Sequence, residues 1–313
     1  MSSTPQPDPS PLAQPLHFSF ANRHASNRFL KAALTERMCT WHPTDLPARG
    51  IPTKEIINLY RRWGEGGFGV ILTGNILIDY EHLEALGNPV IPPDAPFHGQ
   101  RFERFRELAV EAKQHGSLII GQVNHPGRQV DEWIQPHPIS ASDVQLKKAM
   151  GMSFGKPRAA TREDIANFVH GFAHAAEYLY RAGYDGIQLH AAHGYLLAQF
   201  VSKTTNRRTD EYGGSIRNRA RLILEIAAEI RRRVPESTGF VMGIKLNSVE
   251  FQEDGLTVED ATELCGMLER EGRFDFVELS GGSEYPLSRL RTPHFWTLGS
   301  VLTPNRAKHT RTG

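Results

Sequence analysis

The sequence predicts an α/β fold of the TIM (β/α)8 barrel type, and three observations lead to that fold class. Short apolar runs that suit buried strands alternate with amphipathic segments of helical period from residue 27 to residue 279. The length of 313 residues suits one such domain. One apolar run, residues 187–189, leads directly into His190, His193 and Tyr195, and barrels place their chemistry at the carboxyl ends of their strands.

The helical segments carry start and stop signals. The first ends at Gly66 and Gly67, which favour a C-terminal stop. Thr161, with Asp164 three residues later, is a candidate N-cap for the longest helix, and Ser215 opens the helix that follows the histidines. We therefore expect helices at residues 54–65, 102–115, 161–182, 216–234 and 257–271.

Six apolar stretches between these helices have the length and residue types of buried strands. Residues 280–313 are too few for two further strands with their helices, because a βαβ unit takes roughly 30 residues. We therefore expect an incomplete barrel with about six of its eight strands. The first strand and the loop leaving it take residues 27–38, and the other strands lie at residues 68–76, 118–123, 186–189, 240–246 and 274–279. Residues 133–156 lack a clear period and are typical of a substrate lid above the barrel.

Composition excludes several classes of partner. Lys+Arg 36 against Asp+Glu 35 leaves a formal charge of +1, which gives no reason to expect binding to nucleic acid. The mean hydropathy is −0.41, and no apolar run is long enough for a membrane helix. Two cysteines without metal or redox spacing indicate a reducing, cytoplasmic location.

We expect a disordered Pro-rich tail at residues 1–15, one domain at 16–282 and a divergent tail at 283–313.

His190, His193 and Tyr195 are the candidate catalytic residues. Two imidazoles three residues apart on a tight turn can aim N–H groups at one point, which suits holding a substrate carbonyl or an anion, and Tyr195 would supply an acid beside it. The structural alternative is that neighbouring carbonyls satisfy the histidines and Tyr195 only packs. A metal site using His190 and His193 is a third alternative, but no third ligand recurs at suitable spacing, so we expect no metal.

The residues around the histidines carry a family resemblance. The segments HAAHGYLLAQF and TNRRTDEYGGSIRNRARLILEI closely resemble the central signature of the old yellow enzyme family of FMN-dependent oxidoreductases, and the resemblance extends with gaps from Asn27 to about Gly282. It implies a barrel that carries FMN and reduces activated alkenes with NADH or NADPH. It further implies that His190 and His193 hold an unsaturated carbonyl or nitro substrate, and that Tyr195 protonates it.

The resemblance also implies residues that contact the flavin. Structural alternatives stay open: Thr35 could cap the following turn, Gly74 could serve a turn, and Gln122 could bridge neighbouring strands. For Lys245 we favour a functional role over a packing role, because an unpaired buried charge is costly. The positions that match the family are Ala33, Leu34 and Thr35 along the flavin ring, Gly74 at a close approach, Gln122 at the pyrimidine edge and Lys245 at the N1/O2 edge.

The resemblance ends soon after Gly282, so the loops that hold the FMN phosphate in the family have no counterpart. This predicts a C-terminally truncated member, from a truncated product, an altered splice form or a faulty gene model. The alternative to an active enzyme is a catalytically weak or inactive remnant that cannot retain FMN. An open barrel would expose strand edges and apolar interior, which predicts poor solubility or association into a homo-oligomer.

Overall fold

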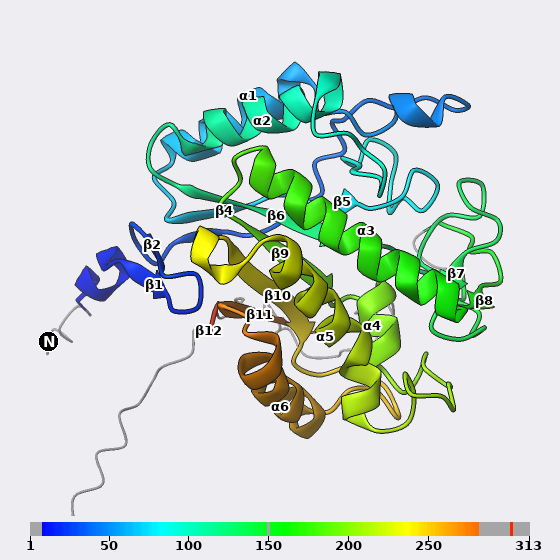
Figure 1. Ribbon diagram of the computed structural model, residues 1–313. Helices are drawn as coiled ribbons and strands as arrows, with labels where there is room; N and C mark the ends of the chain where they lie inside the picture. Colours follow the sequence, from blue (N-terminus) through cyan, green and yellow to red (C-terminus); the bar gives the residue numbers. More distant parts are fainter. Residues whose placement is uncertain (1–7, 149–150, 282–300, 303–313) are drawn as a thin grey trace, which may run out of the picture.

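A mostly parallel sheet forms the centre of the protein (Figure 1). The computed structural model describes residues 8–148 and 151–281 and the backbone of residues 301–302. The strand order is β12-β11-β10-β9-β6-β4-β3, with β5 paired to β6. Neighbours from β3 to β11 are parallel, and β12 is antiparallel to β11. The strands are β3 (Leu30–Lys31), β4 (Val70–Leu72), β5 (Ile76–Leu77), β6 (Leu118–Asn124), β9 (Gly186–Ala191), β10 (Val241–Asn247), β11 (Phe276–Ser280) and β12 (Val301–Leu302).

The six expected strands correspond to β3, β4, β6, β9, β10 and β11, which confirms an incomplete barrel of the TIM type within the described residues. The first strand is short, because only Leu30 and Lys31 pair with β4 before the chain leaves the sheet as a loop. The divergent tail expected at residues 283–313 lies outside the described residues, except for the backbone of β12. Residues 8–15 of the expected tail include one 3-10 turn, Ser10–Ala13.

Helices cover one face of the sheet (Figure 1). Side chains alternate between the two faces of a strand, so Ile71, Ile119 and Ile187 pack in the helix-facing core. Thr161 and Asp164 form the expected capping box, and the side chain of Ser215 accepts the Asn218 N–H. None of the helices in the described ranges is long and apolar enough to cross a membrane. The helices are α1 (Lys54–Glu65), α2 (Gly99–Lys113), α3 (Arg162–Arg181), α4 (Leu196–Val201), α5 (Ile216–Arg233) and α6 (Val258–Met267), followed by a π-helical turn (Leu268–Gly272), with 3-10 turns at Leu46–Ala48 and Glu236–Thr238.

A hairpin that the sequence analysis did not anticipate lies at the amino-terminal end of the barrel strands (Figure 1). It consists of β1 (Leu16–Phe18) and β2 (Arg23–Ala25). Phe18 is buried against inward-facing residues of the strands, including Phe276. The buried Asp275 carboxylate accepts the backbone N–H groups of Phe20, Ala21 and Met242 at 3.0, 2.9 and 2.9 Å. The hairpin therefore closes the end of the barrel opposite the histidines.

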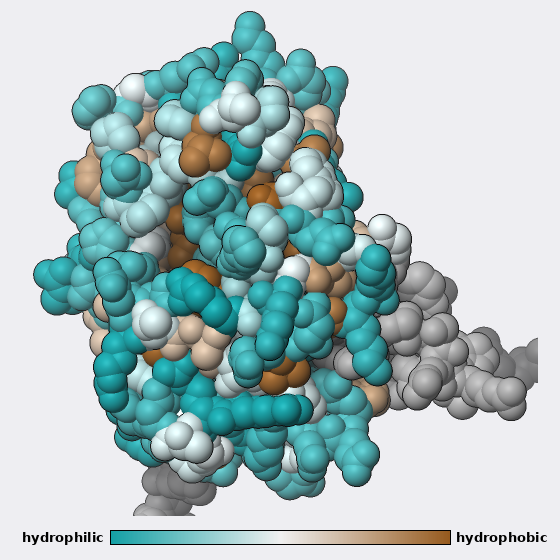
Figure 2. All heavy atoms as spheres, turned by 90° about the vertical axis from the view of Figure 1, so that its right-hand side faces the viewer, coloured by the Kyte–Doolittle hydropathy of each residue, from teal (hydrophilic) through white to brown (hydrophobic). Residues whose placement is uncertain are grey.

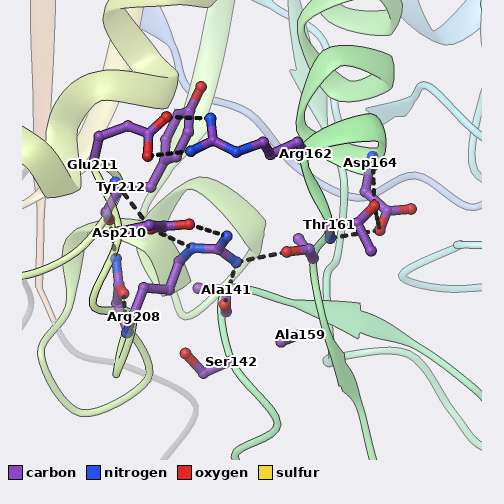
Figure 3. A network of polar contacts seen from close by, with 12 residues as sticks. Ala141, Ser142, Ala159, Thr161, Arg162, Asp164, Arg208, Asp210, Glu211 and Tyr212 are labelled. Carbon is purple, nitrogen blue, oxygen red and sulfur yellow. Dashed lines mark hydrogen bonds and ion pairs between the residues drawn. The ribbon is translucent and has the colours of Figure 1, made fainter.

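Arg208 links the long segment between β6 and α3 to the segment after α4 (Figure 3). The long segment contains the short parallel pair β7 (Ile139–Ser140) and β8 (Arg158–Ala159). One arm of the Arg208 guanidinium donates to the carbonyls of Ala141 and Ala160 at 3.1 and 2.6 Å. Its Nε and Nη2 donate to Asp210 at 3.0 and 2.6 Å. Arg208 therefore holds these two loop segments together.

Candidate active site

The carboxyl ends of four neighbouring strands bring polar side chains together inside the barrel. Gln122 of β6 pairs in register with Gln188 of β9, and Lys245 of β10 lies between His190 of β9 and Glu278 of β11. Viewed from this end of the strands, the surface is mainly hydrophilic, with apolar residues showing in recesses between polar ones (Figure 2). The sheet therefore unites residues separated by more than 150 positions in the sequence.

Three aromatic rings form one cluster at the carboxyl end of β9. The centroid of the His190 ring lies 5.0 Å from that of His193 and 4.8 Å from that of Tyr195, both in edge-on arrangements. His193 adopts a left-handed backbone conformation with φ 57°, and Gly194 follows with φ 74°. These two residues turn the chain from β9 into α4, and Tyr195 is the N-cap residue of that helix.

Hydrogen bonds fix how the two imidazoles are oriented. Nδ1 of His190 accepts the Ala192 N–H at 3.3 Å, which places the ring proton on Nε2. Nε2 of His193 lies 2.6 Å from the Ser280 hydroxyl, and its backbone N–H donates to Asn247 at 3.2 Å. If the serine hydroxyl donates to Nε2, the proton of His193 lies on Nδ1, so each ring has one N–H left to donate.

Burial keeps both histidines neutral at physiological pH. It is the largest cause that lowers the pKa of His193 to about 4, followed by the positive charge of Lys245. The pKa of His190 is lowered well below its ordinary value by burial, then by His193 and Lys245. Burial also raises the pKa of Tyr195 above its ordinary value, while a hydrogen bond from Asn75 acts in the opposite direction. The cluster therefore holds neutral hydrogen-bond donors and a protonated phenol.

Glu278 and Gln188 were not anticipated from the sequence. The Lys245 ammonium forms an ion pair with Glu278 at 3.0 Å, so this lysine is not an unpaired charge. Gln188 Nε2 donates to Glu278 at 2.9 Å, and Gln122 Nε2 donates to Gln188 Oε1 at 2.7 Å. Gln122 thus bridges two strands, as its structural alternative expected. A charged residue in the inward register of the apolar run FVELS was the signal that could have identified Glu278.

The segment expected along the flavin leaves the sheet directly after β3. Leu34 is 58% exposed and Thr35 is exposed, whereas Ala33 is partly buried. Nδ2 of Asn75 lies 3.5 Å from the Thr35 hydroxyl, which links this segment to the loop after β4. A Cβ at Gly74 would collide with the Leu34 carbonyl oxygen and the Glu36 carboxylate. Close packing of these two segments therefore accounts for the glycine without invoking a ligand.

The donor set fits the flavin ring of FMN. A flavin pyrimidine edge needs a donor and an acceptor in one plane and a cation near its N1/O2 edge, and Gln122 and Lys245 supply these chemical types. Asn75, beside Thr35 and Tyr195, has a buried Oδ1 atom without a hydrogen-bond partner among the described residues. A buried unpaired acceptor is costly, which is consistent with a polar ligand at this end of the barrel.

A second histidine cluster lies next to the first but favours hydrogen bonding over metal binding. Among the described residues, the one group of three candidate metal ligands is Asp79, His82 and His125, with atoms within 4.8 Å of one another. Nδ1 of His82 lies 2.6 Å from Asp79 Oδ2, and Nδ1 of His125 accepts the Gly127 N–H at 3.0 Å. The latter bond places the His125 proton on Nε2, the nitrogen that would have to bind the metal.

The chain is similar to known flavin oxidoreductases. The sequence profile of the NADH:flavin oxidoreductase / NADH oxidase family matches residues 11–279. The NADH-dependent flavin oxidoreductase nadA of Aspergillus parasiticus is 60% identical over 276 residues, covering 88% of this chain and 62% of that protein. The NADH-dependent flavin oxidoreductase iliE of Hypocrea jecorina is 33% identical over 281 residues, covering 85% of this chain and 67% of that protein. The chain therefore spans about two thirds of the length of these relatives.

Solved structures show the same fold. Morphinone reductase in complex with tetrahydroNAD superposes with a TM-score of 0.70 at 26% identity, covering 86% of this chain and 73% of that one. A complex of 2-naphthoyl-CoA reductase with 2-naphthoyl-CoA superposes with a TM-score of 0.77 at 26% identity, covering 88% of this chain and 41% of that one. These similarities do not favour the alternative of an inactive remnant.

Proposed function

The chain belongs to the NADH:flavin oxidoreductase / NADH oxidase family, and we propose that it binds FMN and reduces the C=C bond of an activated alkene. NADH or NADPH is the reductant in this proposal. The names of its NADH-dependent relatives and the tetrahydroNAD complex of morphinone reductase support a nicotinamide. The substrate class is an unsaturated carbonyl or nitro compound, because the cluster offers neutral donors to one oxygen.

The observation that carries the proposal is the cluster of His190, His193 and Tyr195 at the end of β9. Bound FMN would supply the hydride. The two imidazole N–H groups hold the carbonyl or nitro oxygen, which draws electron density from the β carbon and makes it accept hydride. The Tyr195 hydroxyl then gives its proton to the α carbon. Burial keeps this hydroxyl protonated until a carbanion-like centre develops beside it.

The remaining predicted residues would contact the cofactor. Gln122 pairs with the pyrimidine edge, and Lys245 stabilises negative charge on the reduced ring. Ala33, Leu34 and Thr35 lie along the ring. Exposure of Leu34 supports this placement, because it leaves an apolar side chain free to contact a flat apolar face.

Stopped-flow kinetics of the two half-reactions tests the proposal. Flavin reduction by NADH or NADPH is followed anaerobically, and reoxidation is then followed with 2-cyclohexenone and with a nitroalkene. Tyr195→Phe should slow alkene-dependent reoxidation by about 10²- to 10⁴-fold, the usual contribution of a general acid, and leave flavin reduction nearly unchanged. Tyr212→Phe is the matched control, because Tyr212 is equally buried, at 8% exposed, but bonds to Glu225. Equal losses in both half-reactions would contradict the acid role of Tyr195.

A further inference from the structure

Glu278 is a buried carboxylate in the inward register of β11, two residues before the Ser280 that contacts His193. It is 4% exposed, and its two oxygens have different partners. Oε1 forms an ion pair with the Lys245 ammonium at 3.0 Å, and Oε2 accepts a hydrogen bond from the Gln188 amide at 2.9 Å. A buried charge in such a position needs both pairing and hydrogen bonds to be tolerated. The proposed hydride and proton transfers give it no role.

The carboxylate fixes the direction of a chain of hydrogen bonds. A carboxylate only accepts, so it forces Gln188 to turn its NH2 group toward Glu278. The carbonyl oxygen of Gln188 then faces Gln122, which must present its own NH2 group at 2.7 Å. The remaining arm of the Gln122 amide is its carbonyl oxygen. The charge on Glu278 thereby decides which atom of Gln122 is left to accept a hydrogen bond from a ligand.

The same carboxylate opposes the charge of Lys245. In register, Lys245 lies between Glu278 on one side and His190 on the other. Its positive charge contributes to the lowered pKa values of both His190 and His193. A negative partner 3.0 Å from the ammonium weakens the field that the lysine exerts on any other group in the site.

We propose that Glu278 is a positioning residue that sets both the orientation of the Gln122 amide and the effective charge of Lys245 toward bound FMN. This inference rests on the proposed function. Flavin N3–H is a donor, and the relay turns Gln122 so that its carbonyl Oε1 can accept that hydrogen bond while the second N–H of its amide can still donate. Partial neutralisation of Lys245 keeps the reduced, anionic flavin from being overstabilised, which preserves its power to donate hydride.

Glu278→Gln separates the shape of the side chain from its charge. The amide is nearly isosteric but can donate as well as accept, so it neither neutralises Lys245 nor fixes the Gln188 amide. Reduced FMN should then bind about tenfold or more tightly relative to oxidised FMN. For a two-electron couple, tenfold corresponds to a rise of about 30 mV in the midpoint potential. Glu278→Asp keeps the charge and should return the potential most of the way to the wild-type value.

A second variant tests the relay without touching the ion pair. Gln188→Met removes the amide between Glu278 and Gln122 at similar volume. It should weaken oxidised and reduced FMN alike, by about tenfold for one misdirected hydrogen bond, and leave the potential unchanged. Glu225→Gln is the control for removal of a charge. Glu225 lies on α5 in the outer helical layer and accepts a hydrogen bond from the Tyr212 hydroxyl.

The experiment measures the dissociation constant of oxidised FMN by absorbance titration, and the midpoint potential by dye equilibration, in wild type and the four variants. The inference would be supported if the midpoint potential is higher than wild type in Glu278→Gln, close to wild type in Glu278→Asp and unchanged in Glu225→Gln. Equal potentials in wild type and Glu278→Gln, with unchanged affinity in Gln188→Met, would overturn it while leaving the proposed function standing. Wild-type protein that takes up no FMN would overturn both. If Glu278→Gln does not fold, affinity and potential in Gln188→Met and Glu278→Asp still decide the matter.

Discussion

Acid should destabilise the protein partly through His193, because burial and then Lys245 lower the pKa of its imidazole to about 4. An unfolded histidine has a pKa of about 6.5. Since the folded value is the lower one, the stability linked to this group is fully present above about pH 6.5 and is lost as the pH falls through about 4. These two pKa values correspond to about 2 kcal/mol of unfolding free energy lost between about pH 7 and pH 4.5.

Urea unfolding of wild type and His193→Asn at both pH values measures this contribution. Asparagine does not titrate and tolerates the left-handed backbone of residue 193, where φ is 57°. Wild type should lose about 2 kcal/mol more than the variant on acidification. Parallel losses in the two proteins would refute the idea that His193 is buried in its neutral form.

Three further substitutions test the packing around the site. Gly74→Ala should destabilise by about 1–3 kcal/mol through overpacking against the Leu34 carbonyl; an unchanged melting temperature would contradict this. Arg208→Lys should release the β7–β8 segment, because lysine cannot bind Asp210 with two N–H groups and also reach two carbonyls. Faster limited proteolysis between residues 141 and 160 is the expected result, and identical cleavage rates would disprove it. Asp275→Ala should cost about 3–5 kcal/mol by removing the buried carboxylate that pairs with Arg231 and leaving three N–H groups without their acceptor. Hydrogen exchange should show the β1–β2 hairpin exposed, and continued protection there would count against its anchoring by Asp275.

Hydrophobic period and capping residues were sufficient to predict most of the barrel. The capping box of Thr161 and Asp164 and the apolar run before His190 are local features, so the sequence displays them directly. The β1–β2 hairpin was missed because its strands are three residues each and its stability comes from distant groups such as Asp275. Tertiary contacts of that kind leave no local pattern in a single sequence.

The site was predictable to the extent that it lies in the chain segment at the end of β9 and just after it. His190, His193 and Tyr195 are near neighbours in sequence, and the structure brings their rings together. The partnership of Lys245 with Glu278 depends instead on the parallel register of β10 and β11, which sequence spacing does not encode. The sequence therefore predicted a cation at Lys245 but not the carboxylate that pairs with it.

Binding of FMN underlies every role proposed for the residues at this end of the barrel. The most direct measurement is the visible absorption spectrum of the purified, desalted protein, recorded before and after incubation with FMN and repeated with Gln122→Leu and Lys245→Met. We predict a flavin spectrum that survives desalting in wild type and is weaker in both variants, because each removes a polar partner of the flavin ring. A wild-type protein that stays colourless after incubation, or variants that retain as much flavin as wild type, would contradict the assignment of this end of the barrel as a flavin site.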